Sequence, residues 1–222
     1  MNFKKLIQLL PGIAFWMLLL FFSLLLAHNA ALYFTHGGEY GILPEKTVAR
    51  QDIWWNIAFY IHLPTGTICL LTPFLLFARA YRKVKRLHQL IGSIFVWTTL
   101  LLVCPTGMYL SMYAKGGAIT QAGFMLQGVL LALFTWLGRR AILRGDLAMH
   151  INHMIRAYAM VAVVLSFRIY HILFFLWNVP YVQNYAISQW LGMAGNALIA
   201  EVIIIMISSK NRKSIHINSQ VI

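Results

Sequence analysis

The stretch Met149–His171, MHINHMIRAYAMVAVVLSFRIYH, has the length and apolar content of a membrane-spanning helix, yet it carries three histidines and two arginines. Ionisable side chains are costly inside a bilayer, so each of them needs a partner or a function. Eighteen residues make five full turns of an α-helix, which puts His150 and Arg168 on the same side. The same spacing aligns His153 with His171, and His153 follows His150 by three residues. The stretch therefore predicts a helix with one polar stripe, an inward face that lines something.

The composition of the whole chain agrees with a membrane location. Of its 222 residues, 60% are hydrophobic and only 10% are charged, and the mean hydropathy is +0.72. The net charge of +13 comes from short basic clusters between apolar runs, as in the cytoplasmic loops of membrane proteins. Nucleic-acid binding is therefore not expected. The two cysteines, Cys69 and Cys104, lie in apolar runs without a Cys-x-x-Cys spacing, which argues against a zinc site or a disulfide.

The apolar runs predict an all-α fold, a bundle of six transmembrane helices in one integral membrane domain over residues 1–222. The first run is longer than the apolar part of a signal peptide, so we interpret it as a span. Pro64 and Pro73 are expected to bend the second helix, with neighbouring helices satisfying the freed carbonyl groups. The third is expected to break near Pro105. The spans are predicted at residues 9–32, 53–77, 90–113, 119–137, 147–177 and 186–207, followed by a basic tail over 209–222.

The basic residues predict how the chain crosses the membrane. Cytoplasmic loops of membrane proteins are enriched in lysine and arginine. One predicted side holds only Lys46, Arg50 and Lys115. We therefore predict a multi-pass protein of the cytoplasmic (inner) membrane with both termini in the cytoplasm. The other side, with the adjoining helix ends, holds Lys4, Lys5, Arg79, Arg82, Lys83, Lys85, Arg86, Arg139, Arg140, Arg144, Arg156, Lys210, Arg212 and Lys213.

Five histidines are candidate ligands of a cofactor. At about 1.5 Å per residue, His62 and His171 reach similar depths in the outer half of the membrane. His88 and either His150 or His153 reach similar depths near the cytoplasmic ends. Paired imidazoles on different helices could bind haem b, and copper is a further option for the metal. The alternative is that histidines at helix ends contact lipid head groups.

Three charged side chains within the spans have separate predictions. Arg168 lies in the outer half, where no span carries an acid, so it could anchor an anionic group such as a haem propionate or a substrate carboxylate. Contact with helix-end carbonyl groups or with acidic loop residues is the alternative. Arg156 and Glu201 match in depth and in sign, which predicts a structural ion pair between the fifth and sixth spans. A proton path through Glu201 is the alternative for that carboxylate.

Several short motifs in combination are similar to a known family. They are RLHQLIG at 86–92, Gly145-Asp146, His150-x-x-His153-Met154-Ile155-Arg156, Arg168, Gln189-Trp190 and NALIAE at 196–201. Together they resemble the bacterial membrane family catalogued as domain of unknown function 2306, over roughly residues 50–205. The family pattern usually has tryptophan where this chain has His153. The resemblance implies the class of membrane protein and implies no chemistry.

The polar residues leave three classes of function open. The lead hypothesis is electron transfer of the b-type cytochrome kind, with quinones as candidate reaction partners, in which the five histidines bind haem or metal and Arg168 binds an anion. The second is a proton- or anion-coupled transporter, in which the polar stripe lines a pathway. The third is a non-catalytic membrane scaffold, in which the polar groups only hold helices together. No catalytic residue is predicted, and neither the substrate nor the oligomeric state follows from the sequence.

Overall fold

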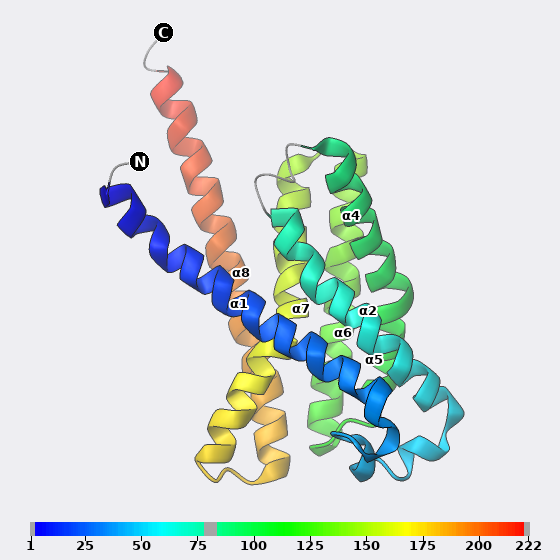
Figure 1. The fold of residues 1–222 in the computed structure, drawn as a ribbon. Coiled ribbons are helices and arrows are strands. Elements are labelled where there is room, and N and C mark those ends of the chain that lie inside the picture. The colour runs from blue at the N-terminus through cyan, green and yellow to red at the C-terminus, as the bar shows by residue number, and fades with distance from the viewer. Residues whose placement is uncertain (1–2, 78–83, 220–222) are drawn as a thin grey trace. The chain divides into compact units, whose positions relative to one another are not determined.

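The computed structural model describes the backbone of residues 3–77 and 84–219, and the side chains of residues 16–77 and 84–209 (Figure 1). The predicted charges at positions 4–5, 79–83 and 210–213 lie outside these described side chains. The elements in chain order are α1 (Phe3–His36), η1 (Gly37–Glu39), η2 (Leu43–Glu45), η3 (Ala49–Gln51), α2 (Ile53–Phe77), α4 (Lys85–Thr98), η4 (Thr99–Val103), α5 (Cys104–Ser111), α6 (Gly117–Leu143), α7 (Leu147–Leu176) and α8 (Tyr181–Ser219).

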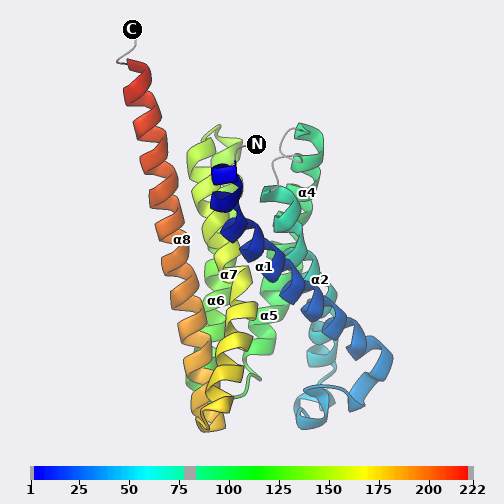
Figure 2. The ribbon, with the colours of Figure 1, turned by 60° about the vertical axis from the view of Figure 1, so that its left-hand side comes forward.

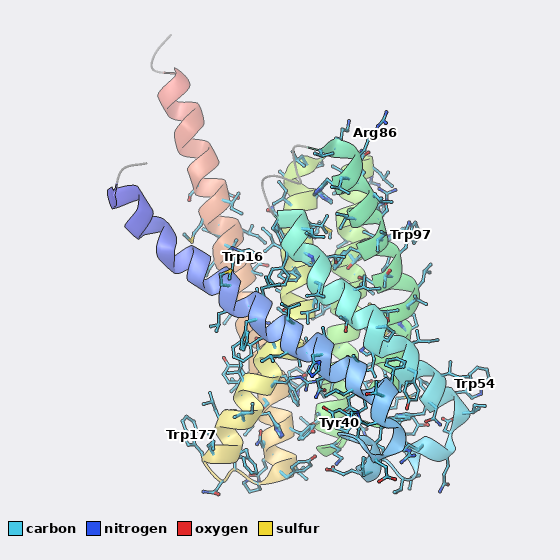
Figure 3. All side chains as sticks on the ribbon, in the orientation of Figure 1. Trp16, Tyr40, Trp54, Arg86, Trp97 and Trp177 are labelled. Atoms are coloured by element: carbon cyan, nitrogen blue, oxygen red, sulfur yellow. The ribbon has the colours of Figure 1, made fainter. Side chains whose placement is uncertain are left out.

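The described part of the chain is entirely helical between its turns and contains no strand. Among the described residues, six helical segments are long and apolar enough to cross a membrane, which confirms the predicted all-α, six-helix fold. Tryptophans at the ends of two helices, Trp54 and Trp177, point away from their helices (Figure 3). Such side chains are typical of the membrane–water interface. The segments are Trp16–Glu39, Ile53–Phe77, Lys85–Ser111, Gly117–Leu143, Leu147–Leu176 and Tyr181–Ser209.

The chain forms two compact units, Met1–Thr106 and Gly107–Ile222. The first unit contains α1, α2, α4, η4 and the start of α5. The second contains the end of α5 with α6, α7 and α8. The prediction of a single membrane domain stays a prediction.

In the first unit, aromatic side chains pack α1 against α2 and the following loop against α1. Tyr33 is buried, with its ring 5.2 Å from that of Phe59 on α2. Its hydroxyl accepts a hydrogen bond from the backbone N–H of Ile42 at 3.2 Å. A Cβ at Gly41 would lie 2.2 Å from this hydroxyl oxygen, and Gly41 has φ +60°, so this turn requires glycine. The loop, which contains three short 3₁₀ turns, thus packs against the end of α1 through the first of them, η1.

The prolines of the first unit change local hydrogen bonding without ending a helix. α2 runs continuously from Ile53 to Phe77 through Pro64 and Pro73. Pro73 lacks the N–H that would bond the carbonyl of Cys69, and the hydroxyl of Thr72 donates to that oxygen instead at 3.5 Å. The freed carbonyl of Cys69 therefore accepts from its own helix, and not from a neighbouring helix as predicted.

The expected break near Pro105 takes a different form. The chain stays helical, and a π-helical segment, η4, immediately precedes α5. Proline disturbs the carbonyl four residues before it, which here is that of Leu101 inside η4. The irregularity therefore lies before the proline. Thr99 of this segment is fully buried, and its hydroxyl lies 3.2 Å from the thiol of Cys69.

In the second unit, α6, α7 and α8 lie side by side (Figure 2), with α7 packed against both of the others. Ala157 and Val163 on α7 are fully buried, so α7 is the central helix of this unit. Asp146 begins α7 by accepting a hydrogen bond from the backbone N–H of Met149 at 2.9 Å. α8 begins at Tyr181, five residues before the predicted start at 186, and runs on through the predicted tail to Ser219.

Candidate functional site

The candidate residues are divided between the two units. His62 and His88 belong to the first unit, and His150, His153 and His171 belong to the second. The predicted outer and inner pairs each take one histidine from either unit, so both pairs stay predictions. Within each unit, the hydrogen bonds of the individual histidines show which ring nitrogen carries the proton.

His62 lies in α2 beside a threonine of α5. Its Nδ1 is 3.0 Å from the hydroxyl oxygen of Thr106. That hydroxyl donates its single proton to the carbonyl oxygen of Leu102 at 2.6 Å. The oxygen of Thr106 must therefore accept from Nδ1–H, which leaves Nε2 of His62 with its lone pair. Gly66 lies one turn along the same face, and a Cβ there would be 3.9 Å from Nε2.

His171 is held by an asparagine near the start of α8. Its Nδ1 lies 2.9 Å from Oδ1 of Asn184, while Nδ2 of Asn184 donates to the backbone carbonyl of His171 at 3.0 Å. A carbonyl oxygen can only accept, so the orientation of this amide is fixed. Oδ1 also accepts from the hydroxyl of Ser188 at 2.9 Å. His171 thus carries its proton on Nδ1, and Nε2 keeps the lone pair.

Aromatic rings surround the imidazole of His171. The Phe167 ring stacks on it with centroids 5.6 Å apart, and the Tyr185 ring meets it edge-on at 4.6 Å. Tyr181 adds a third ring at 6.1 Å. Nζ of Lys115 lies 5.5 Å above the Tyr181 ring, and partial burial lowers the pKa of this amine. His171 therefore sits in a preorganised aromatic setting.

The other histidines differ from one another. His150 directs Nδ1 to the carbonyl oxygen of Gly138 on α6 at 2.8 Å, so it has the same tautomer as His62 and His171. The ring of His153 stacks on Phe134 at 6.4 Å, and its Nδ1 is buried with no hydrogen-bond partner among the described residues. His88 is half-buried in the first turn of α4. Within residues 16–77 and 84–209, no three His, Cys, Asp or Glu side chains are placed to share one metal ion.

The polar stripe of α7 is less uniform than the sequence predicts. Its three histidines are half-buried, whereas Arg168 is exposed. The reason is that α7 packs on two neighbours, with His150 bonding to α6 and His171 to α8. One straight helix face therefore cannot point inward along the whole of α7. The anion-binding role of Arg168 stays a prediction.

Arg156 and Glu201 form a bidentate ion pair between α7 and α8. Nε of Arg156 lies 2.5 Å from Oε1 of Glu201, and Nη2 lies 2.9 Å from Oε2. The guanidinium group also lies 6.0 Å from the centroid of the Phe134 ring on α6. Two parallel charge-assisted hydrogen bonds fix the orientation of both side chains. This geometry serves to hold the two helices together.

Uncharged polar residues in the second unit make hydrogen bonds between helices that the sequence did not predict. Gln189 donates to Gln127 at 2.8 Å, and Gln127 donates to the carbonyl of Met160 at 2.9 Å. Asn196 accepts from Ser166 at 2.8 Å and donates to the carbonyl of Ala159 at 3.1 Å. The sequence predictions rest on charges and histidines and include no amides or hydroxyls within apolar runs. Their positions in the spans were the signal that could have found them.

Comparison with known proteins gives one match. The family model described as "Predicted membrane protein (DUF2306)" matches residues 59–204, which is more than half of the chain, and the chain belongs to this family. No curated protein and no solved structure matches it. The family relationship agrees with the resemblance in the sequence motifs and supports a multi-pass membrane protein.

Proposed function

We propose that this membrane protein transfers electrons in the manner of a b-type cytochrome, with haem b bound through histidine Nε2 atoms. One observation carries the proposal. His62, His150 and His171 each direct Nδ1–H to an oxygen acceptor within their own unit. Histidines that ligate metals characteristically donate the other ring N–H in this way, which fixes the ring and makes the ligating nitrogen more basic.

In this proposal the chain's own residues orient the ligands. Thr106 and Asn184 hold the imidazoles of His62 and His171 through hydrogen bonds, and the carbonyl of Gly138 holds that of His150. Haem would supply one-electron chemistry. His88 and His153 remain the further candidates for the inner pair, and Arg168 the candidate contact for a propionate.

We further propose that the protein lies in the cytoplasmic (inner) membrane with both termini in the cytoplasm. The support is the concentration of lysine and arginine on one predicted side. A membrane-dissolved quinone is the proposed reaction partner, because an electron carrier within the bilayer needs a redox partner that reaches it there.

A structural scaffold is the second candidate, and a specific observation favours it. In the second unit, polar side chains connect neighbouring helices. They are Gln127, Ser166 and Asn196, which form hydrogen bonds, and Arg156 with Glu201, which form an ion pair. Such contacts explain these residues without a bound group. They account equally for the Nδ1–H bonds of His62, His150 and His171, but they give no role to the Nε2 lone pairs that these bonds leave.

The test is the visible absorption spectrum of the purified protein in detergent, oxidised and reduced, with iron and copper measured on the same sample. The proposal expects a reduced haem b spectrum that is weakened or shifted in His62→Ala, His171→Ala and His150→Ala. His36→Ala is the matched control, because Nδ1 of His36 also lies 3.2 Å from a carbonyl oxygen but its side chain is exposed at the end of α1. A colourless preparation without metal would favour the scaffold.

A further inference from the structure

One stripe of exposed side chains on α6 changes from apolar to basic toward the α6–α7 turn. Its members are spaced by four, three, four and four residues, which keeps them on one face of the helix. Val129 and Leu133 are each 46% exposed and Trp136 is 51% exposed. Arg140 and Arg144 follow and are exposed as well. Along this face, the order is therefore aliphatic, then tryptophan, then arginine.

The arginines of this stripe have no counter-charge within the part of the chain that the structure describes. Neither Arg140 nor Arg144 makes a side-chain hydrogen bond or ion pair there, and the same holds for the adjacent Arg139. The nearest carboxylate in sequence, Asp146, accepts from the backbone N–H of Met149 at the start of α7. Two exposed guanidinium groups at the end of a membrane helix are thus available to an anion.

We propose that this stripe binds an anionic phospholipid, with its phosphate at Arg140 and Arg144. Guanidinium groups bind phosphate oxygens through paired, charge-assisted hydrogen bonds. Trp136 lies one turn before Arg140, where an indole ring fits the level between head groups and acyl chains. Val129 and Leu133 continue the same face and pack along an acyl chain. The three chemical zones of a phospholipid match the three zones of the stripe in order.

Arginines near the C-terminus of a helix also interact favourably with the helix dipole, whatever the surrounding lipid. That effect would stabilise α6 equally in neutral and anionic membranes. Dependence on the lipid head group is therefore what separates lipid binding from a local effect on the helix.

The experiment measures lipids retained by the whole purified protein, by native mass spectrometry with phosphatidylglycerol or phosphatidylcholine added to the detergent. We expect the wild type to retain phosphatidylglycerol preferentially. Arg140→Gln with Arg144→Gln should weaken that binding on the order of tenfold, since each basic residue contributes to attraction by anionic lipids. The matched control removes two other exposed charges, Lys85→Gln with Arg86→Gln at the start of α4 (Figure 3), and should keep the binding within about twofold of wild type.

Several outcomes would overturn the proposal. Equal retention of the two lipids by the wild type would exclude head-group selectivity. Equal loss in the α4 control would assign the effect to total surface charge. Competition by millimolar inorganic phosphate as strong as by the lipid would indicate a free phosphate site. If the double variant fails to fold, Arg144→Gln alone, just beyond the end of α6, should still weaken binding by about threefold or more, and unchanged binding there would reject the site.

Discussion

The two units of this protein satisfy the polar groups of their helices in different ways. In the first unit, hydroxyl groups bond to backbone carbonyls close to prolines, as Thr72 does beside Pro73 and Thr106 beside Pro105. In the second unit, where α6 and α7 contain no proline, amides and charged groups bond across from one helix to another, as Gln127, Asn184 and Arg156 do.

This difference determines what holds each candidate histidine. His62 is held by the hydroxyl of Thr106 and by the backbone at Val103, both set by the irregular segment at and before Pro105. His171 depends on a buried amide that makes three hydrogen bonds and ties α7 to α8. The same tautomer thus results from a hydrogen bond to one hydroxyl beside the π-helical segment in the first unit. In the second unit it results from a network of hydrogen bonds between α7 and α8. Substitutions in the network should therefore cost more stability.

The largest effect is expected for Asn184→Leu in the second unit. This change removes three hydrogen bonds and leaves the Nδ1–H of His171 and the hydroxyl of Ser188 without their acceptor. We expect a loss of about 3 kcal/mol in the free energy of unfolding, measured by denaturation in mixed micelles. Gln183→Leu is the control, because Gln183 precedes Asn184 in the sequence and its side chain is exposed. This change should alter the free energy of unfolding by less than about 0.5 kcal/mol. Equal losses in both variants would contradict a special role for the amide.

An intermediate effect is expected at the ion pair. Arg156→Met leaves Glu201 without its bidentate partner, and we expect a loss of about 1 to 2 kcal/mol, discounted because the Glu201 side chain is half-exposed. Arg156→Met with Glu201→Leu removes both charges and should be less destabilising than Arg156→Met alone, because no unpaired charge remains. A double-mutant cycle in the same unfolding assay measures the difference. If the two losses simply add, the pair contributes no coupling between α7 and α8.

The helices themselves were predictable because apolar length and proline positions act locally. The second and fifth spans agree with α2 and α7 to within one residue. The sixth helix starts earlier because Pro180, which follows the end of α7, provides the carbonyl that accepts the N–H of Asn184 in the first turn of α8. The π-helical segment was not predicted, since the displacement from Pro105 depends on how the preceding turn repacks.

The site was predictable only in part, for a related reason. Matching depth and sign was enough to pair Arg156 with Glu201, because two opposite charges in apolar surroundings have few other partners. The partners of the histidines were not predicted, since Thr106 and Asn184 are uncharged and Asn184 lies before the predicted sixth span at 186–207. The exposure of Arg168 was not predicted. Helical phase shows which residues share a side of one helix, but burial depends on which sides the neighbouring helices cover.

The smallest effect is expected in the first unit, at the hydroxyl that orients His62. Thr106→Val keeps the shape of the side chain but removes the acceptor of Nδ1–H, so we expect a loss of about 1 kcal/mol in the free energy of unfolding. Thr106→Ser restores a hydroxyl and should recover most of this loss. Thr65→Val is the matched control, because the hydroxyl of Thr65 bonds only to carbonyls of its own helix, at Ile61 and His62.

The coupling between Thr106 and His62 distinguishes a hydrogen bond from general packing. In a His62→Ala background, Thr106→Val should cost almost nothing further, because the proton that the hydroxyl accepts is gone. If instead Thr106→Val costs the same in both backgrounds, its contribution lies in its bond to the carbonyl of Leu102, and the tautomer of His62 is not set by Thr106. Since the proposed haem ligation needs Nε2 as the acceptor nitrogen, that outcome would remove the support that the Thr106 contact gives to electron transfer, while leaving His150 and His171 unaffected.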